Sequence, residues 1–188
     1  MSLFRTLQHS PATISIFHNA KVPASASLYK ILDKSYWKLN EEKSQFQVDL
    51  MANQMPTYDQ FNLIYHQCLH NQTHKDILRD CFPFMRDQRL STNKNSSITV
   101  TSPIGLLANA KGGSGNLKVF LEGEYSMIYE AFNSLVNDPT PDVNPANLFL
   151  APLVVDWDQN LIANNEESLS VILNKYKADI TDAGLSPA

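Results

Sequence analysis

Two cysteines are the side chains of this sequence best suited to forming a covalent intermediate. Cys68 and Cys81 are the only cysteines among the 188 residues, too few for the disulfide framework of a small secreted protein. A thiol becomes nucleophilic when cations or a helix N-terminus stabilise its thiolate. The cations close to Cys81 in sequence are Lys75, Arg79, Arg86 and Arg89. We therefore take Cys81 as the first candidate nucleophile and Cys68 as the second.

A structural role for both cysteines is the alternative. Cys81 follows a short predicted helix around 75–80, and the dipole at a helix C-terminus opposes ionisation of a thiol. Phe82-Pro83-Phe84 could form an apolar wall around it. Cys68 lies on the apolar stripe of another predicted helix, and a Cys68–Cys81 disulfide would need Cα atoms roughly 4.4–6.8 Å apart. The sequence therefore leaves two hypotheses open: that one cysteine is a reactive thiol, or that both cysteines are buried and structural.

Three histidines suggest a further chemistry, metal binding. His66, His70 and His74 recur every four residues, so a continuous helix would stack their imidazoles on one side and offer ligands to zinc or nickel. No carboxylate or thiolate is evident as a further ligand on that side. A solvated helix face is the simpler interpretation, and we expect neither a bound metal nor a cofactor apart from an external thiol such as glutathione.

Composition limits the partners. The net charge is −4 and the pI about 5.7, so no overall positive field attracts nucleic acid or anionic lipid. No apolar run approaches the roughly 20 residues of a membrane span, and no secretory signal is evident. Residues 1–32 contain three basic residues and no acidic one, a weak similarity to a mitochondrial transit peptide. We expect no nucleic-acid or membrane partner, and a small-molecule substrate or thiol donor instead.

Hydrophobic periodicity predicts that the chain begins with a β-α-β unit. Residues 13–17 alternate in polarity and are rich in β-branched side chains, which predicts a strand. A helix follows, capped by Ser25 or Ser27, with Leu28, Ile31 and Leu32 at helical spacing. Residues 46–50 form a second alternating run. Two strands joined by a helix normally pair in parallel.

The remaining elements complete one α/β domain spanning residues 1–188. Thr57 and Gln60 have capping-box spacing and begin a helix that carries Cys68. We treat residues 69–148 as a largely helical insertion, with an amphipathic helix over 125–136. A buried strand at 153–156, a hairpin to 161–163 and a closing helix end the chain. Asn164 or Asn165 can cap that helix, whose inner stripe is Leu169, Ile172, Leu173 and Tyr176.

Three segments together resemble a fungal family of mitochondrial proteins proposed to be redox proteins with a thioredoxin fold. They are residues 6–17, Met55–Gln60 and Val155–Ile162. The resemblance implies a thioredoxin-like β-α-β-α-(insertion)-β-β-α fold, a mitochondrial location, and thiol oxidoreductase activity on small molecules through a single cysteine. Asp76–Cys81 is the best local match to the helical segment that holds the family's cysteine.

An alternative alignment places that cysteine near Tyr129–Glu130, where this chain has none. The chain would then be a non-catalytic thioredoxin-fold binding protein with structural cysteines. Residues 16–19 and Pro56-Thr57 also resemble the arsenate-reductase branch of the fold, whose reactive cysteine follows the first strand. Val22 stands at that place, so arsenate chemistry is not expected. Pro152 resembles the cis-proline that these folds place before the third strand.

Overall fold

The computed structural model describes residues 10–41, 43–83 and 121–183. The chain divides into two compact units, one formed by Met1–Ala52 with Ala151–Ala188 and the other by Asn53–Leu150. The second unit begins ahead of the insertion expected at 69–148 and ends close to it. Arg86 and Arg89, two of the cations expected beside Cys81, lie outside the described residues.

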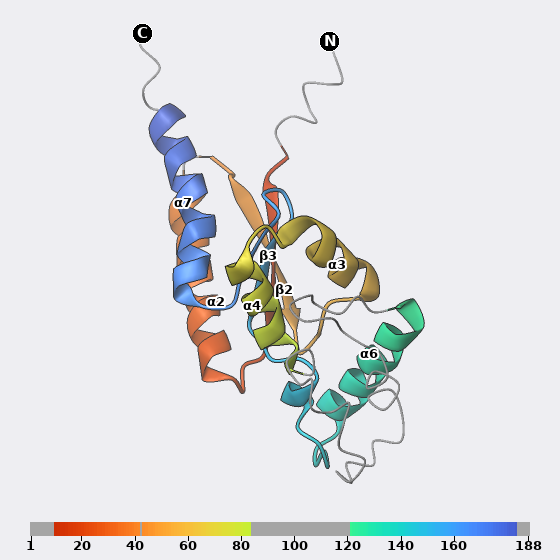
Figure 1. The fold of residues 1–188 in the computed structure, drawn as a ribbon. Helices are drawn as coiled ribbons and strands as arrows, with labels where there is room; N and C mark the ends of the chain where they lie inside the picture. The colour runs from red at the N-terminus through yellow and green to blue at the C-terminus, as the bar shows by residue number, and fades with distance from the viewer. Residues whose placement is uncertain (1–9, 42, 84–120, 184–188) are drawn as a thin grey trace, which may run out of the picture. The chain divides into compact units, whose positions relative to one another are not determined.

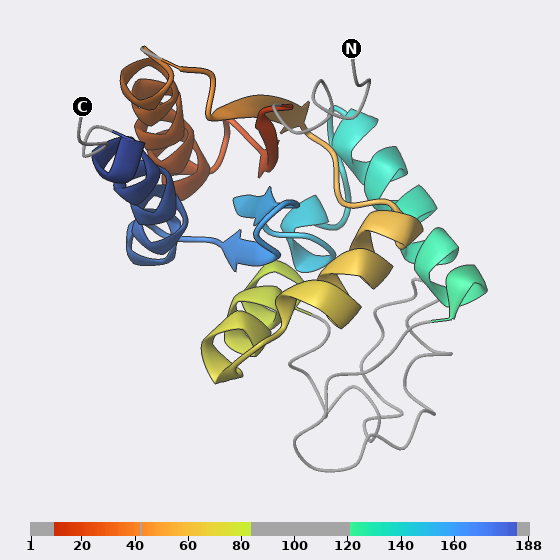
Figure 2. The same cartoon turned by 90° about the horizontal axis from the view of Figure 1, so that it is seen from above.

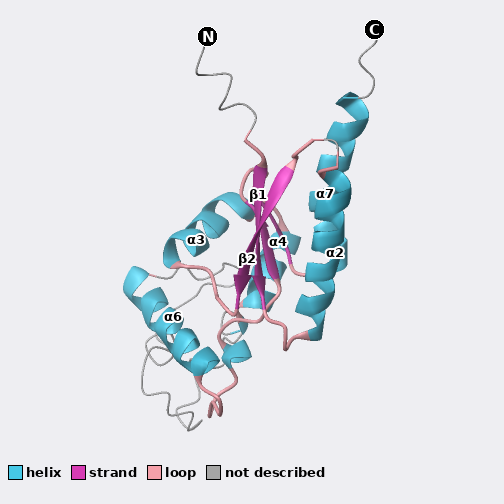
Figure 3. Ribbon diagram, turned by 180° about the vertical axis from the view of Figure 1, so that it is seen from behind, coloured by secondary structure: helices cyan, strands magenta, loops and turns pink. Residues whose placement is uncertain are grey.

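The first unit contains a mixed four-stranded sheet with the order β2-β1-β3-β4 (Figure 3). Its strands are β1 (Ala12–His18), β2 (Phe46–Ala52), β3 (Leu153–Asp156) and β4 (Leu161–Ala163). β1 pairs with β2 in parallel, whereas β3 runs antiparallel to β1 and β4 antiparallel to β3. The predicted α/β class, the parallel pair and the hairpin are therefore confirmed.

Two helices, α2 (Pro23–Leu39) and α7 (Glu166–Ala183), lie side by side on one face of this sheet (Figures 1 and 2). Their inner stripes and the strand side chains facing them form the core of the unit. Its buried members are Ile14, Ile16, Leu28, Leu32, Leu39, Phe46, Val154, Leu161, Ala163, Leu169, Ile172, Leu173 and Tyr176. Burying a large apolar side chain contributes about 1.5–3 kcal/mol. The stripe predicted for the closing helix is thus confirmed.

The start of α2 differs from the prediction. The helix begins at Pro23 with Val22 at the N-cap, not at a serine cap. Proline suits the first helical position because its φ is already helical and its missing N–H would have no partner there. Ser25 lies inside the helix, where its Oγ accepts a hydrogen bond from the Asn19 N–H at 3.0 Å. At α7, by contrast, the Asn165 Oδ1 accepts the Ser168 N–H at 2.9 Å, which confirms the predicted cap.

A buried carboxylate, Asp156, organises the turn between β3 and β4. Its Oδ1 accepts the N–H groups of Asp158 and Gln159 at 3.1 and 2.9 Å. Its Oδ2 accepts the Gln159 side-chain amide at 2.9 Å and the Tyr176 hydroxyl at 2.6 Å. Burial, together with the Asp156 carboxylate, raises the pKa of Tyr176. A carboxylate removed from water needs this full set of donors, so Asp156 ties the turn to α7.

The second unit is helical in the residues described. It contains α3 (Tyr58–Leu63), the π-helix η1 (Ile64–Cys68), α4 (Gln72–Cys81), α6 (Glu122–Asn137) and the short 3₁₀ helix η4 (Pro145–Asn147). The predicted capping box is present at the start of α3. None of the helices in the part of the chain that the structure describes combines the length and apolar character needed to cross a bilayer.

Aromatic side chains form the core of this unit. The ring of Phe61 lies 4.8 Å from that of Tyr125 and 5.3 Å from that of Phe82. Phe149 extends the cluster, at 5.3 Å from Phe82 and 5.9 Å from Phe132. Tyr125 is fully buried, and its hydroxyl donates to the Pro56 carbonyl at 2.5 Å. Such ring pairs stabilise the unit beyond the burial of their apolar surface, because aromatic rings prefer particular relative orientations.

Candidate functional site

The junction between β1 and α2 is the first candidate site, because the resemblance would place a reactive cysteine at the position of Val22. Val22 is half-buried and is the N-cap of α2, with no side chain capping the helix. The neighbouring polar groups are hydrogen-bonded to one another. The Ser25 Oγ lies 2.8 Å from the His18 Nδ1, and it also accepts a hydrogen bond from the Asn19 N–H. Ser25 is fully buried. The junction is held by these hydrogen bonds, and the one side-chain hydroxyl among residues 18–25, that of Ser25, is buried.

Cys81 is the last residue of α4, and its side chain is 1% exposed. Burial raises the pKa of its thiol, since a thiolate is poorly stabilised away from water. Of the cations expected nearby, Arg79 forms an ion pair with Asp76 at 3.2 Å. The carbonyl of Cys81 accepts the Leu150 N–H at 2.8 Å. These surroundings favour a neutral thiol packed in the core of the second unit.

Cys68 is equally buried. It is the last residue of η1 and is 1% exposed. Like Cys81, it is a thiol rather than half of a disulfide. Its backbone lies near the His74 imidazole and contributes to the pKa of that group. The residue fits the apolar stripe that its sequence position predicted.

The three histidines do not form the continuous stack that their spacing suggested. The π-helix ends at Cys68 and Asn71 caps a new helix, so His66 and His74 lie on different elements. The rings of His70 and His74 are 5.8 Å apart in an edge arrangement. Burial, followed by the nearby His70, lowers the pKa of His74, and its hydrogen bond to Cys68 partly offsets this. Within residues 10–41, 43–83 and 121–183, no three metal-ligating side chains come close enough to hold an ion.

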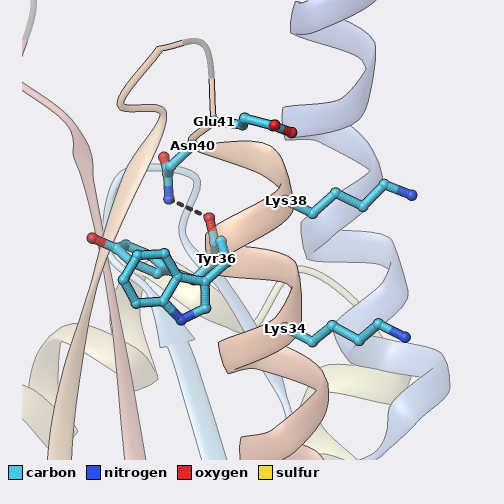
Figure 4. A pocket seen from close by; sticks show the side chains of 6 residues that line it. Lys34, Tyr36, Lys38, Asn40 and Glu41 are labelled. Carbon is cyan, nitrogen blue, oxygen red and sulfur yellow. Dashed lines mark hydrogen bonds between the residues drawn. The ribbon is translucent and has the colours of Figure 1, made fainter.

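A hollow at the C-terminal end of α2 is a feature that sequence reasoning missed. Its volume is about 610 Å³, and it is lined by Lys34, Tyr36, Trp37, Lys38, Asn40 and Glu41 (Figure 4). The Asn40 side chain fixes the turn after the helix, because its Nδ2 donates to the Tyr36 carbonyl at 3.0 Å. Its Oδ1 accepts the Gln45 N–H at 2.6 Å. Lysines at four-residue spacing beside a tryptophan were the available signal.

Comparison with known proteins identifies a family. Residues 4–165 match the family described as "Protein of unknown function (DUF1687)", and this range covers most of the chain. No curated protein and no solved structure matches the chain significantly.

Proposed function

We propose that this chain, which belongs to the DUF1687 family, is a thioredoxin-like mitochondrial protein that works by binding and not through a thiol of its own. The observation that carries the proposal is the placement of the thiols. Val22 occupies the helix N-terminus at which such folds hold their nucleophile, and both cysteines are 1% exposed. A nucleophilic thiol needs both an ionised form and access to substrate. Both cysteines lack that access, and burial also raises the pKa of Cys81.

The thioredoxin-like part of the proposal is supported by strand order and direction. A parallel pair, β1 with β2, is followed across the sheet by the antiparallel β3 and β4. Two helices, α2 and α7, cover the same sheet face. Pro152 directly precedes β3, and the Ala151–Pro152 bond is cis, as the resemblance implies. The order of these elements is compatible with the predicted order β-α-β-α-(insertion)-β-β-α.

The mitochondrial location is supported by the family resemblance and by the acid-free composition of residues 1–32. Transit peptides are basic and poor in acidic residues. Import of the full chain into isolated mitochondria, with protection from added protease only when the membrane potential is intact, is the expected result. A chain that stays protease-sensitive outside energised mitochondria would contradict the location.

A second candidate is a thiol oxidoreductase acting through Cys81. It is favoured by the state and position of Cys81, which is a thiol outside any disulfide and is the last residue of α4, the helix that contains the Asp76–Cys81 match. The Cys81 thiolate would attack one sulfur of a small disulfide, form a mixed disulfide and release the other half as a thiol. Glutathione would then attack the bound half as its thiolate, leave with it as a mixed disulfide and restore Cys81.

Turnover of a small disulfide distinguishes the two candidates. The assay follows glutathione-dependent reduction of bis(2-hydroxyethyl) disulfide by the full chain, Cys81→Ser and Cys68→Ser. The binding proposal predicts that all three proteins leave the uncatalysed rate unchanged. Turnover that disappears in Cys81→Ser but survives in Cys68→Ser would establish the oxidoreductase instead. A valine-to-cysteine change at position 22 supplies a positive control for thiol chemistry at the helix N-terminus.

A further inference from the structure

We propose that the exposed face of α2 around Trp37 docks an acidic segment of a partner protein. The Trp37 face consists of Lys30, Lys34, Trp37 and Lys38, together with the hollow beside them. Trp37 is 70% exposed. Single apolar side chains at a surface need no explanation on their own, but here the tryptophan lies close to three exposed lysines and lines a concave surface. The inference holds whether or not a thiol of this protein is reactive.

The charge on this face calls for an acidic partner. Lys30, Lys34 and Lys38 stand at four-residue spacing and are all exposed, and in the described part of the chain none of them forms an ion pair. Figure 4 shows the Lys34 and Lys38 side chains extending in the same direction from α2. Like charges at this spacing destabilise a helix. Three lysines against Asp33 and Glu41 leave this face with a net positive charge, in a chain of net charge −4, and a net positive face is complementary to carboxylates from outside.

The tryptophan is presented on a rigid support. Its ring lies 5.4 Å from that of Tyr36, which in turn lies 6.0 Å from the buried Phe46. Asn40 fixes the turn that follows, through its bonds to Tyr36 and Gln45. Binding hot spots are enriched in tryptophan, and a preorganised anchor loses less entropy on binding. The hollow of about 610 Å³ leaves room beside Trp37 for an apolar side chain of the partner.

A protein segment fits this face better than an anionic membrane does. Asp33 on α2 and Glu41, just beyond the end of this helix, are exposed close to the lysines in the chain. A uniformly anionic bilayer repels both carboxylates, whereas a folded or extended polypeptide can place carboxylates against the lysines only. Trp37 is also the one large apolar side chain that the hollow's lining contributes to the exposed surface, and stable membrane anchoring normally needs more apolar area.

Selection from random peptides tests the inference without assuming a sequence. Short random peptides displayed on phage are selected on the full chain, and the enriched peptides are synthesised and titrated by calorimetry. We expect them to be acidic, with an aromatic or large aliphatic residue. Trp37→Ala, and the double change Lys34→Glu with Lys38→Glu, should each weaken their binding at least about tenfold. The matched reversal on α7, Lys175→Glu with Lys177→Glu, should change it less than about twofold.

Other outcomes overturn the inference. Failure to enrich any peptide, enrichment of neutral or basic peptides, or equal binding to Trp37→Ala would each do so. Phosphatidylglycerol vesicles form a separate arm: if the Lys34 and Lys38 reversal abolishes vesicle binding and no peptide is enriched, the face is a membrane surface. All the substituted side chains are exposed, so circular dichroism should show unchanged melting. A variant that fails to fold is replaced by Lys34→Gln with Lys38→Gln, for which we expect the same direction of effect.

Discussion

Replacing Val22 by cysteine should give this protein a reactive thiol at the start of α2. Val22 is the N-cap of α2, is half-buried and has no competing side-chain cap. Unpaired N–H groups and the helix dipole stabilise a thiolate at such a position. We expect the pKa of the new thiol to be about 7, against about 8.5 for an unperturbed cysteine.

The size of the effect follows from the ionised fraction. Near pH 6 a thiol with a pKa of about 7 is ionised about thirtyfold more than one with a pKa of about 8.5. The lower basicity reduces the intrinsic nucleophilicity by about fivefold, given a Brønsted coefficient of about 0.45. The net expectation is therefore about sixfold faster alkylation by iodoacetamide at that pH.

Val171→Cys is the matched control. Val171 is 54% exposed in the interior of α7, so the same substitution there yields an accessible thiol far from a helix N-terminus. Mass spectrometry separates each new thiol from the two native ones, whose alkylation should be much slower. Equal rates and equal pH profiles for the two engineered thiols would refute the placement of Val22 at a functional helix N-terminus.

Four further substitutions test the stability of each unit by urea unfolding. Asp156→Ala leaves the Tyr176 hydroxyl and three N–H donors without their acceptor, so it should cost about 3–5 kcal/mol, and Tyr176→Phe about 1–3 kcal/mol. His74→Gln should flatten the pH dependence of the free energy of unfolding. The pKa of His74 in the folded protein lies below 6.5, so the unfolded chain binds more protons than the folded one near that pH. The wild type therefore loses stability as the pH falls below about 6.5, and the variant should lose less. Thr57→Ala removes half of the capping box and should cost about 1 kcal/mol, whereas an unchanged urea midpoint would contradict the cap.

The elements of the first unit could be predicted because their signals are local. Alternation over residues 13–17 and the 3.6-residue stripe of α7 both mark side chains of the core, although Ser15 and Phe17, on the other face of β1, are buried as well. The start of α2 could not be predicted so well. Ser25 has a suitable side chain for an N-cap, but its Oγ is hydrogen-bonded to the Asn19 N–H and the His18 imidazole. The helix begins instead at Pro23. Only the path of the preceding loop decides between these roles.

The candidate site was harder to predict because reactivity depends on neighbours in space. Basic residues near Cys81 in sequence suggested a stabilised thiolate, yet Arg79 pairs with Asp76 and the thiol itself is buried. Ile77 and Leu78, at helical spacing before Cys81 and also buried, were the local indication of its orientation. The prediction that the three histidines stack was wrong for a different reason. It assumed an unbroken helix, whereas the π-helix ends at Cys68 and a new helix is capped by Asn71.

Thiol reactivity of the native protein tests the central claim most directly. The rate of reaction of Cys68 and Cys81 with iodoacetamide is measured against pH, by mass spectrometry of the intact chain. The account predicts that both thiols react at least about a thousandfold more slowly than free cysteine, as expected when exposure requires an opening that costs about 4 kcal/mol. Complete unfolding in guanidinium should restore the ordinary rate. Rapid alkylation of Cys81 in the folded protein, with an apparent pKa below about 8.5, would contradict it.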